Sequence, residues 1–169
     1  MIGKVNLTEL IVLVPVILAG IIDFKTMKIP NYITFPFIIT TLIYNIILGN
    51  FKIALISLAI SFILGNLFFI IGGMGGGDVK LMIGIAIMLG YKEFFNILFI
   101  ASIIGVLWGL SLIIRKYFKE RTFNIKNLHY DIFFIKDFFK SSLFKRNKND
   151  RVIIPFGTCL AIGTIIHYF

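Results

Sequence analysis

Long runs without a charged residue constrain the fold of this chain more than any other feature. Six such runs have 13, 23, 25, 11, 21 and 18 residues and cover 10–22, 29–51, 53–77, 81–91, 94–114 and 152–169. A helix needs about 20 apolar residues to cross the hydrocarbon core of a bilayer. With 59% hydrophobic and 15% charged residues, a chain of 169 residues has too much apolar surface for a water-soluble globule. The runs therefore predict a membrane protein.

The predicted fold class is all-α, a polytopic membrane protein with six transmembrane helices in a single membrane-embedded domain over 1–169. The two short runs, 10–22 and 81–91, are not long enough to cross the bilayer alone. The first span therefore takes in flanking residues, and the fourth is a short span entered through a glycine-rich loop. The expected spans are about 6–24, 31–49, 53–71, 79–91, 94–114 and 152–169.

The basic residues favour one orientation of these spans. If the first span ends in the cytoplasm, 14 of the 17 lysines and arginines face the cytoplasm, and only Lys4, Lys52 and Lys92 face outside. This predicts a multi-pass protein of the inner (cytoplasmic) membrane with both termini outside. The net charge of +9 then reflects membrane topology, and we expect no nucleic-acid partner.

A basic cytoplasmic segment, 115–151, separates the last two predicted spans. Its apolar residues Leu128, Ile132, Ile135 and Phe139 recur at helical spacing among several lysines. This pattern predicts either an amphipathic helix that binds anionic membrane lipids or a cytoplasmic loop that folds on itself. Under both alternatives the catalytic residues lie elsewhere.

Asp78 follows a cluster in which five of the six residues 72–77 are glycine. A glycine inside a helix costs about 1 kcal/mol relative to alanine, so we expect an open loop there that another chain can approach closely. The helix after the loop would place Asp78 beside its N-terminus, where free N–H groups and the helix dipole favour a negative charge. A carboxylate at a membrane boundary indicates function, because burying it unpaired costs several kcal/mol.

Asp23 ends the first predicted span and is followed by Ile29-Pro30-Asn31. Pro30 breaks the chain before the second span, and Asn31 is expected to cap the helix that starts there. Because the connections between the first four spans are short, we expect the carboxylates of Asp23 and Asp78 to face each other. Two close carboxylates share a proton, so one activates a water while the other donates a proton, without metal or cofactor.

Other interpretations of the same residues stay open. Asp23 alone would also fit a boundary residue paired with Lys25 or Lys28. The glycine segment would also fit a half-helix ion site in a small transporter or channel.

Three motifs resemble those of one family of membrane proteases. Gly75-Gly76-Gly77-Asp78 matches the GxGD motif of membrane aspartyl proteases, and its continuation through Lys80 resembles type IV prepilin peptidases, which include archaeal preflagellin peptidases. Asp23 with the Ile-Pro-Asn segment resembles that family's first-aspartate region. Residues 154–157, Ile-Pro-Phe-Gly, resemble its C-terminal pattern. The three motifs occur in the family's order.

The resemblance implies an aspartic-type endopeptidase that cleaves the leader peptide of prepilin-like or preflagellin precursors at the cytoplasmic membrane face. Asp23 and Asp78 would be its catalytic pair, and no metal is implied. The supporting residues that the resemblance implies are Gly75, Gly76, Gly77 and Lys80 in the active-site loop, and Ile29, Pro30, Asn31, Pro155 and Gly157 in the flanking motifs.

Many bacterial members carry a paired-cysteine domain before the aspartate segment and also methylate the new N-terminus. This chain starts almost directly with its first predicted span and we expect no such domain, so the resemblance is to a short, peptidase-only form. For Cys159 we expect packing. For His129 and His167 we expect boundary positions without a nearby carboxylate partner. A catalytically silent component of a pilus or secretion assembly is the remaining alternative.

Overall fold

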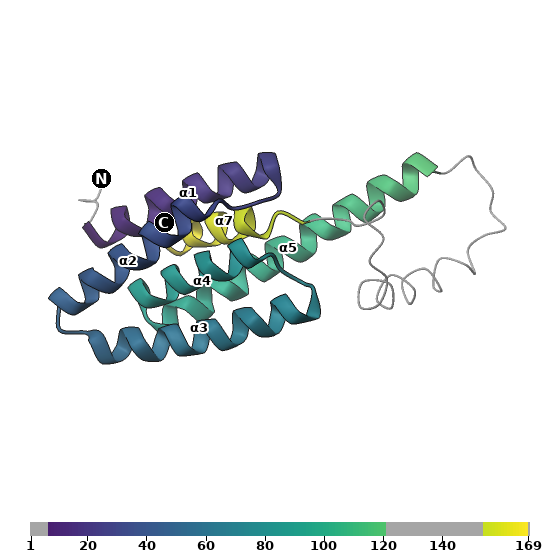
Figure 1. The fold of residues 1–169 in the computed structure, drawn as a ribbon. Coiled ribbons are helices and arrows are strands. Elements are labelled where there is room, and N and C mark those ends of the chain that lie inside the picture. Colours follow the sequence, from purple (N-terminus) through teal and green to yellow (C-terminus); the bar gives the residue numbers. More distant parts are fainter. Residues whose placement is uncertain (1–6, 121–153, 169) are drawn as a thin grey trace. The chain divides into compact units, whose positions relative to one another are not determined.

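The chain folds into a bundle of α-helices. A computed structural model of the chain describes residues 7–120 and 154–168, and these residues form six helices and no strand, which confirms the predicted all-α class. The helices, drawn in Figure 1, are α1 Leu7–Thr26, α2 Asn31–Ile47, α3 Phe51–Ile71, α4 Gly76–Leu89, α5 Tyr91–Glu120 and α7 Phe156–Tyr168.

The chain divides into two compact units. The first contains Met1–Gly105 and Pro155–Phe169, and the second contains Val106–Ile154. α5 continues to Glu120, beyond the predicted end of its span at 114. The remainder of the segment 115–151, and with it the predicted amphipathic helix and lipid site, lies outside the described residues.

α4 is the central helix of the first unit. Nine of its 14 residues are buried, on every side of the helix. α2 and α3 pack along α4, and α1 lies beside α7 (Figure 1). A helix that is apolar all round is stable when other elements surround it. The short fourth helix, about 21 Å long at 1.5 Å per residue, is therefore an internal element of the bundle.

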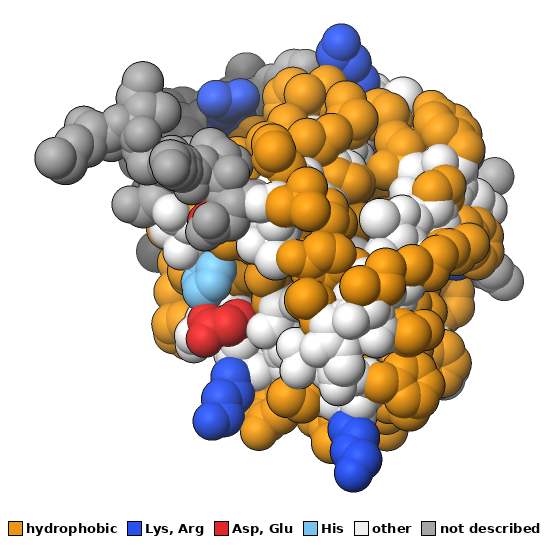
Figure 2. Space-filling model, turned by 90° about the vertical axis from the view of Figure 1, so that its left-hand side faces the viewer, with side chains coloured by type: hydrophobic (Ala, Val, Ile, Leu, Met, Phe, Trp, Pro, Cys, Tyr) orange, Lys and Arg blue, Asp and Glu red, His pale blue; other side chains and the backbone are white. Residues whose placement is uncertain are grey.

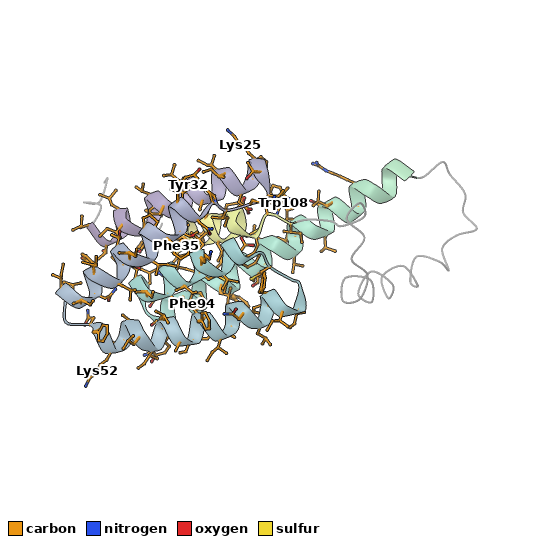
Figure 3. The ribbon with its side chains drawn as sticks, in the orientation of Figure 1. Lys25, Tyr32, Phe35, Lys52, Phe94 and Trp108 are labelled. Carbon is orange, nitrogen blue, oxygen red and sulfur yellow. The ribbon has the colours of Figure 1, made fainter. Side chains whose placement is uncertain are left out.

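The helices around α4 bury one stripe each and expose apolar side chains on the opposite face. In α3, for example, Ala54, Ser57, Ser61 and Gly65 are buried, whereas Ile63 is 67% exposed. Figure 2 shows hydrophobic side chains over most of the face drawn, with charged ones near its edges. In Figure 3, Lys25 and Lys52 point away from the bundle, while Phe94 lies between the helices. An apolar surface of this extent fits contact with lipid.

Among residues 7–120 and 154–168, three stretches are long and apolar enough to cross a membrane: Leu7–Thr26, Phe51–Ile71 and Tyr91–Leu112. α2 and α7 are apolar but shorter. The membrane character of the chain is thus supported by its helices, and the six-span topology stays a prediction.

The glycine cluster between α3 and α4 is only partly a loop. Gly72 ends α3 in the left-handed conformation, with φ 83°, and the N–H groups of Gly72 and Gly73 donate to carbonyls of the last turn of α3. Contrary to the prediction of a loop up to 77, Gly76 and Gly77 form the first turn of α4. The N–H groups at the start of any helix lack a helical partner. Here the side chain of Asp78 accepts a hydrogen bond from one of them, the N–H of Gly75.

Gly84 in α4 provides a test of this packing. A Cβ added at Gly84 would overlap the ring of Phe37 from α2, which is 2% exposed. We expect Gly84→Ala to lower the free energy of unfolding by about 1–3 kcal/mol, measured by denaturant titration in detergent micelles. Adding Phe37→Leu should recover part of the loss.

The matched control is Gly105→Ala in α5, where the nearest atoms lie 3.8 Å from the added Cβ. That variant should be as stable as the parent or slightly more stable, because alanine favours the helix. Equal stability of the Gly84 and Gly105 variants would contradict the close packing of α2 on α4.

Candidate active site

The side chains of Asp23 and Asp78 come together where three helix ends meet. Asp23 lies near the C-terminal end of α1 and Asp78 in the first turn of α4, and they are 4% and 8% exposed. The two carboxylates are close enough for the charge of Asp23 to act on Asp78. The start of α7 reaches the same place, since a Cβ on Gly157 would lie 3.0 Å from Asp23 Oδ2. The arrangement is therefore a buried carboxylate pair against a helix N-terminus.

Asp78 is held by its own helix. The backbone N–H of Gly75 donates a hydrogen bond of 2.9 Å to Asp78 Oδ2, which is the contact that an acidic residue at the third helical position makes with the residue before the helix. The other oxygen, Oδ1, is buried and has no hydrogen-bond partner among the described residues. A buried carboxylate oxygen needs a partner, so Oδ1 is the atom at which a water or a shared proton would bind.

Asp23 is held by α7, far away in sequence. The backbone N–H of Thr158 donates to Asp23 Oδ2 over 3.3 Å. The hydroxyl of Thr158 donates to the carbonyl oxygen of Gly20, one turn before Asp23 in α1, over 3.0 Å. Thr158 is not among the site residues that the sequence predicts. Its only signal there is that it directly follows the Ile-Pro-Phe-Gly motif.

Ile29 connects the three sequence motifs in space. A Cβ on Gly77 would lie 2.8 Å from Ile29 Cβ, and a Cβ on Gly157 would lie 2.5 Å from Ile29 Cδ1 and 3.0 Å from Asp23 Oδ2. Glycine at both positions therefore lets the connection between α1 and α2 pack against the starts of α4 and α7. Pro155 is buried just before α7, and its carbonyl oxygen accepts bonds from the N–H groups of Thr158 and Cys159.

Lys80 and Asn31 contact each other near the starts of α4 and α2. Lys80 Nζ donates to Asn31 Oδ1 over 2.7 Å and lies 4.5 Å from the centre of the Phe35 ring. The predicted helix cap at Asn31 is wrong: Pro30 is the N-cap residue of α2 and no side chain bonds there. The Asn31 side chain is instead engaged with Lys80, which links the start of α2 to the start of α4.

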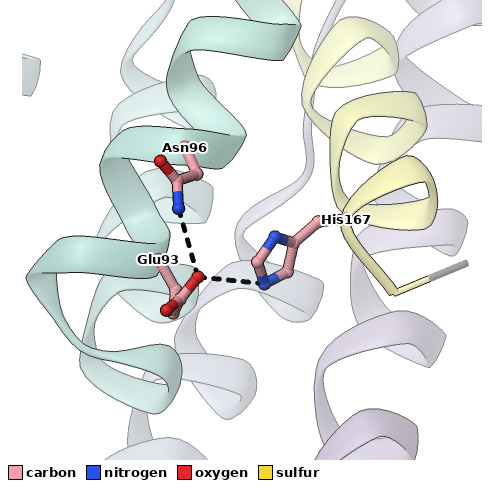
Figure 4. A network of polar contacts seen from close by, with 3 residues as sticks. All are labelled: Glu93, Asn96 and His167. Carbon is pink, nitrogen blue, oxygen red and sulfur yellow. Dashed lines mark hydrogen bonds and ion pairs between the residues drawn. The ribbon is translucent and has the colours of Figure 1, made fainter.

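The opposite ends of the helices carry a second polar group. His167 Nε2 in α7 lies 3.4 Å from Glu93 Oε2 in α5, and Asn96 donates to the same oxygen over 3.3 Å (Figure 4). The expectation that His167 lacks a nearby carboxylate is thus wrong in space, because Glu93 is remote only in sequence. Cys159 is buried, as expected for a packing residue. His129 lies outside the described residues.

The surroundings of the carboxylate pair suit a peptide substrate. Gly73, Gly75 and Gly76, next to Asp78, are exposed and have no side chains, so an extended peptide can approach their backbone closely. Within the described ranges, no three His, Cys, Asp or Glu side chains gather as a metal site. The arrangement can activate a water between two carboxyl groups and supply a proton to a leaving group.

Part of this chain is similar in sequence to known proteins. A family model described as the type IV leader peptidase family matches residues 10–110. A curated protein of Vibrio cholerae serotype O1, the prepilin leader peptidase/N-methyltransferase, is 38% identical over 92 residues, which cover 48% of this chain and 36% of the relative. The matched region thus spans about a third of the relative's length. No solved structure shows a significant match.

Proposed function

Because the chain belongs to the type IV leader peptidase family, we propose that it is an aspartic-type endopeptidase that removes the leader peptide of prepilin-like precursors. The observation that carries the proposal is the buried pair of Asp23 and Asp78, held by backbone N–H groups of two helix starts. The family supports a peptidase acting on prepilin leaders, and the similar Vibrio cholerae protein carries that name. Preflagellin-like precursors share the same chemistry and are included in the proposed substrate class.

In the proposed mechanism one carboxyl group is ionised and the other is protonated. The ionised group takes a proton from a water while the water oxygen attacks the carbonyl carbon of the scissile peptide bond. The protonated group then gives its proton to the amide nitrogen as the C–N bond breaks. Asp78 Oδ1, which has no partner among the described residues, is the oxygen proposed to hold the water or the shared proton. No metal or cofactor takes part.

The proposed location follows from the family and from the distribution of basic residues. The chain would lie in the inner membrane with six spans, both termini outside and the aspartates at the cytoplasmic face, where 14 of its 17 lysines and arginines would also lie. Anionic lipids are the proposed partners of the basic segment 115–151. A precursor would then present its leader in the cytoplasm and its apolar helix in the membrane.

The direct test is cleavage of peptides by the purified full chain in detergent micelles. The panel contains synthetic peptides with a short basic leader followed by an apolar segment, and mass spectrometry locates the cut bond. We expect one cut, at the junction of leader and apolar segment, in buffer containing a metal chelator. Peptides without the basic leader serve as controls. Failure to cut any peptide of the panel would favour a catalytically silent assembly component.

A further inference from the structure

The two aspartates are held in different ways. Asp78 is positioned by Gly75, three residues before it, so its geometry is local to α4. Asp23 is positioned by the start of α7, a segment 135 residues later in the sequence. The position of the Asp23 carboxylate therefore depends on how α7 docks on α1.

Thr158 makes two contacts with α1 that are three residues apart. Its hydroxyl donates to the carbonyl oxygen of Gly20 over 3.0 Å, and its backbone N–H donates to Asp23 Oδ2 over 3.3 Å. Residues three apart in a helix lie on the same face, so Thr158 can bond both to the backbone of α1 at Gly20 and to the carboxylate of Asp23. The bond from the Thr158 hydroxyl to Gly20 fixes the position of α7 along the axis of α1. This position determines the distance between the Thr158 N–H and the Asp23 carboxylate.

Close packing makes the hydroxyl contact specific to this register. A Cβ on Gly20 would lie 2.6 Å from Ala161 Cβ and 3.6 Å from Thr158 Cα, so α1 and α7 are already at minimum separation there. The helices can therefore not approach each other more closely at this level. The side chain of Thr158 is the group that bonds across the interface at this level.

We propose that Thr158 is a positioning residue for the reaction. Its hydroxyl fixes the position of α7 against α1, so that the backbone N–H of Thr158 orients the Asp23 carboxylate. The inference rests on the proposed peptidase function, and it assigns Thr158 no contact with the reacting atoms. Its loss should weaken the chemical step more than substrate binding, because its hydrogen bonds are to α1 and the Asp23 carboxylate.

The test uses Thr158→Val, which keeps the shape and removes the hydroxyl. With a leader peptide that the parent chain cleaves, we expect kcat to fall about tenfold, as for loss of one hydrogen bond that orients a reacting group, with KM nearly unchanged. Thr158→Ser, which keeps the hydroxyl, should restore most of kcat. The matched control is Thr164→Val in the same helix, where a fully buried hydroxyl donates only within α7, to Leu160 O over 2.8 Å.

The outcomes separate this inference from the proposed function. Absence of cleavage by the parent chain would overturn the proposed function, and the inference with it. If the parent cleaves, a kcat of Thr158→Val within twofold of the parent would overturn the inference alone. So would an equal loss of kcat in Thr164→Val at a matched loss of stability, because the effect would then be one of general helix packing. A lower kcat in Thr158→Val, restored by serine and absent in Thr164→Val, would support it.

Discussion

Asp23→Asn and Asp78→Asn are each expected to lower the rate of leader cleavage by about a thousandfold or more, the scale of losing a general acid or base. Asparagine has the size of aspartate but neither takes up nor releases the proton that the mechanism needs. Its side-chain oxygen can still accept the bonds from Gly75 N–H and Thr158 N–H. The measurement is the gel shift of a co-expressed precursor, with single-turnover cleavage of a leader peptide by the purified variants.

The control for these variants is Glu93→Gln, which removes a carboxylate at the opposite end of the helices, where Glu93 contacts His167 and Asn96. Cleavage by that variant should stay within about twofold of the parent, since no hydrogen bond of the site depends on it. All three variants should insert in the membrane to the same level. Cleavage at the parent rate by either aspartate variant would contradict the two-carboxylate mechanism. The family assignment, which rests on sequence similarity, would be unaffected.

The helices of this fold could be predicted from the sequence because lipid-facing helices are marked by long uncharged runs. The predicted spans 31–49 and 53–71 differ little from α2 Asn31–Ile47 and α3 Phe51–Ile71. The boundaries were less accurate where special contacts decide them. α4 starts at Gly76 because Asp78 bonds back to Gly75, and the sequence alone shows only an excess of glycine, which usually indicates a loop.

The contacts of the candidate site were predictable only in part. The sequence indicated that Asp23 and Asp78 lie at helix ends on one side, and in the structure both are buried, near the end of α1 and in the first turn of α4. It did not indicate that Asn31 would bond to Lys80, or that His167 would reach Glu93. Such pairs depend on which helices are neighbours and at what height, and hydrophobic periodicity carries no information on either. Thr158 was missed for the same reason.

Gly157→Ala is the second variant for which we expect a large loss, at least about a hundredfold in kcat, because a misplacement of reacting groups by about 1 Å has an effect of that size. The added Cβ would lie 2.5 Å from Ile29 Cδ1, 3.0 Å from Asp23 Oδ2 and 3.2 Å from Asp23 Cγ. The start of α7 would have to move away from α1, or the carboxylate would have to rotate. Either change also disturbs the hydrogen bond from the Thr158 N–H to Asp23 Oδ2.

A second substitution separates the packing effect from the effect on the carboxylate. Ile29→Val removes the Cδ1 atom that the alanine would meet first, so the variant Gly157→Ala/Ile29→Val should regain stability in denaturant titration. Its cleavage rate should stay low, since the contact with Asp23 persists. Gly163→Ala, also in α7, is the matched control: its Cβ would lie 3.1 Å from Ile97 O and 3.2 Å from Ala101 N in α5. It should lower stability while the folded fraction keeps its cleavage rate. If stability and cleavage recover together in the double variant, Gly157 serves helix packing alone and has no separate effect on the position of Asp23.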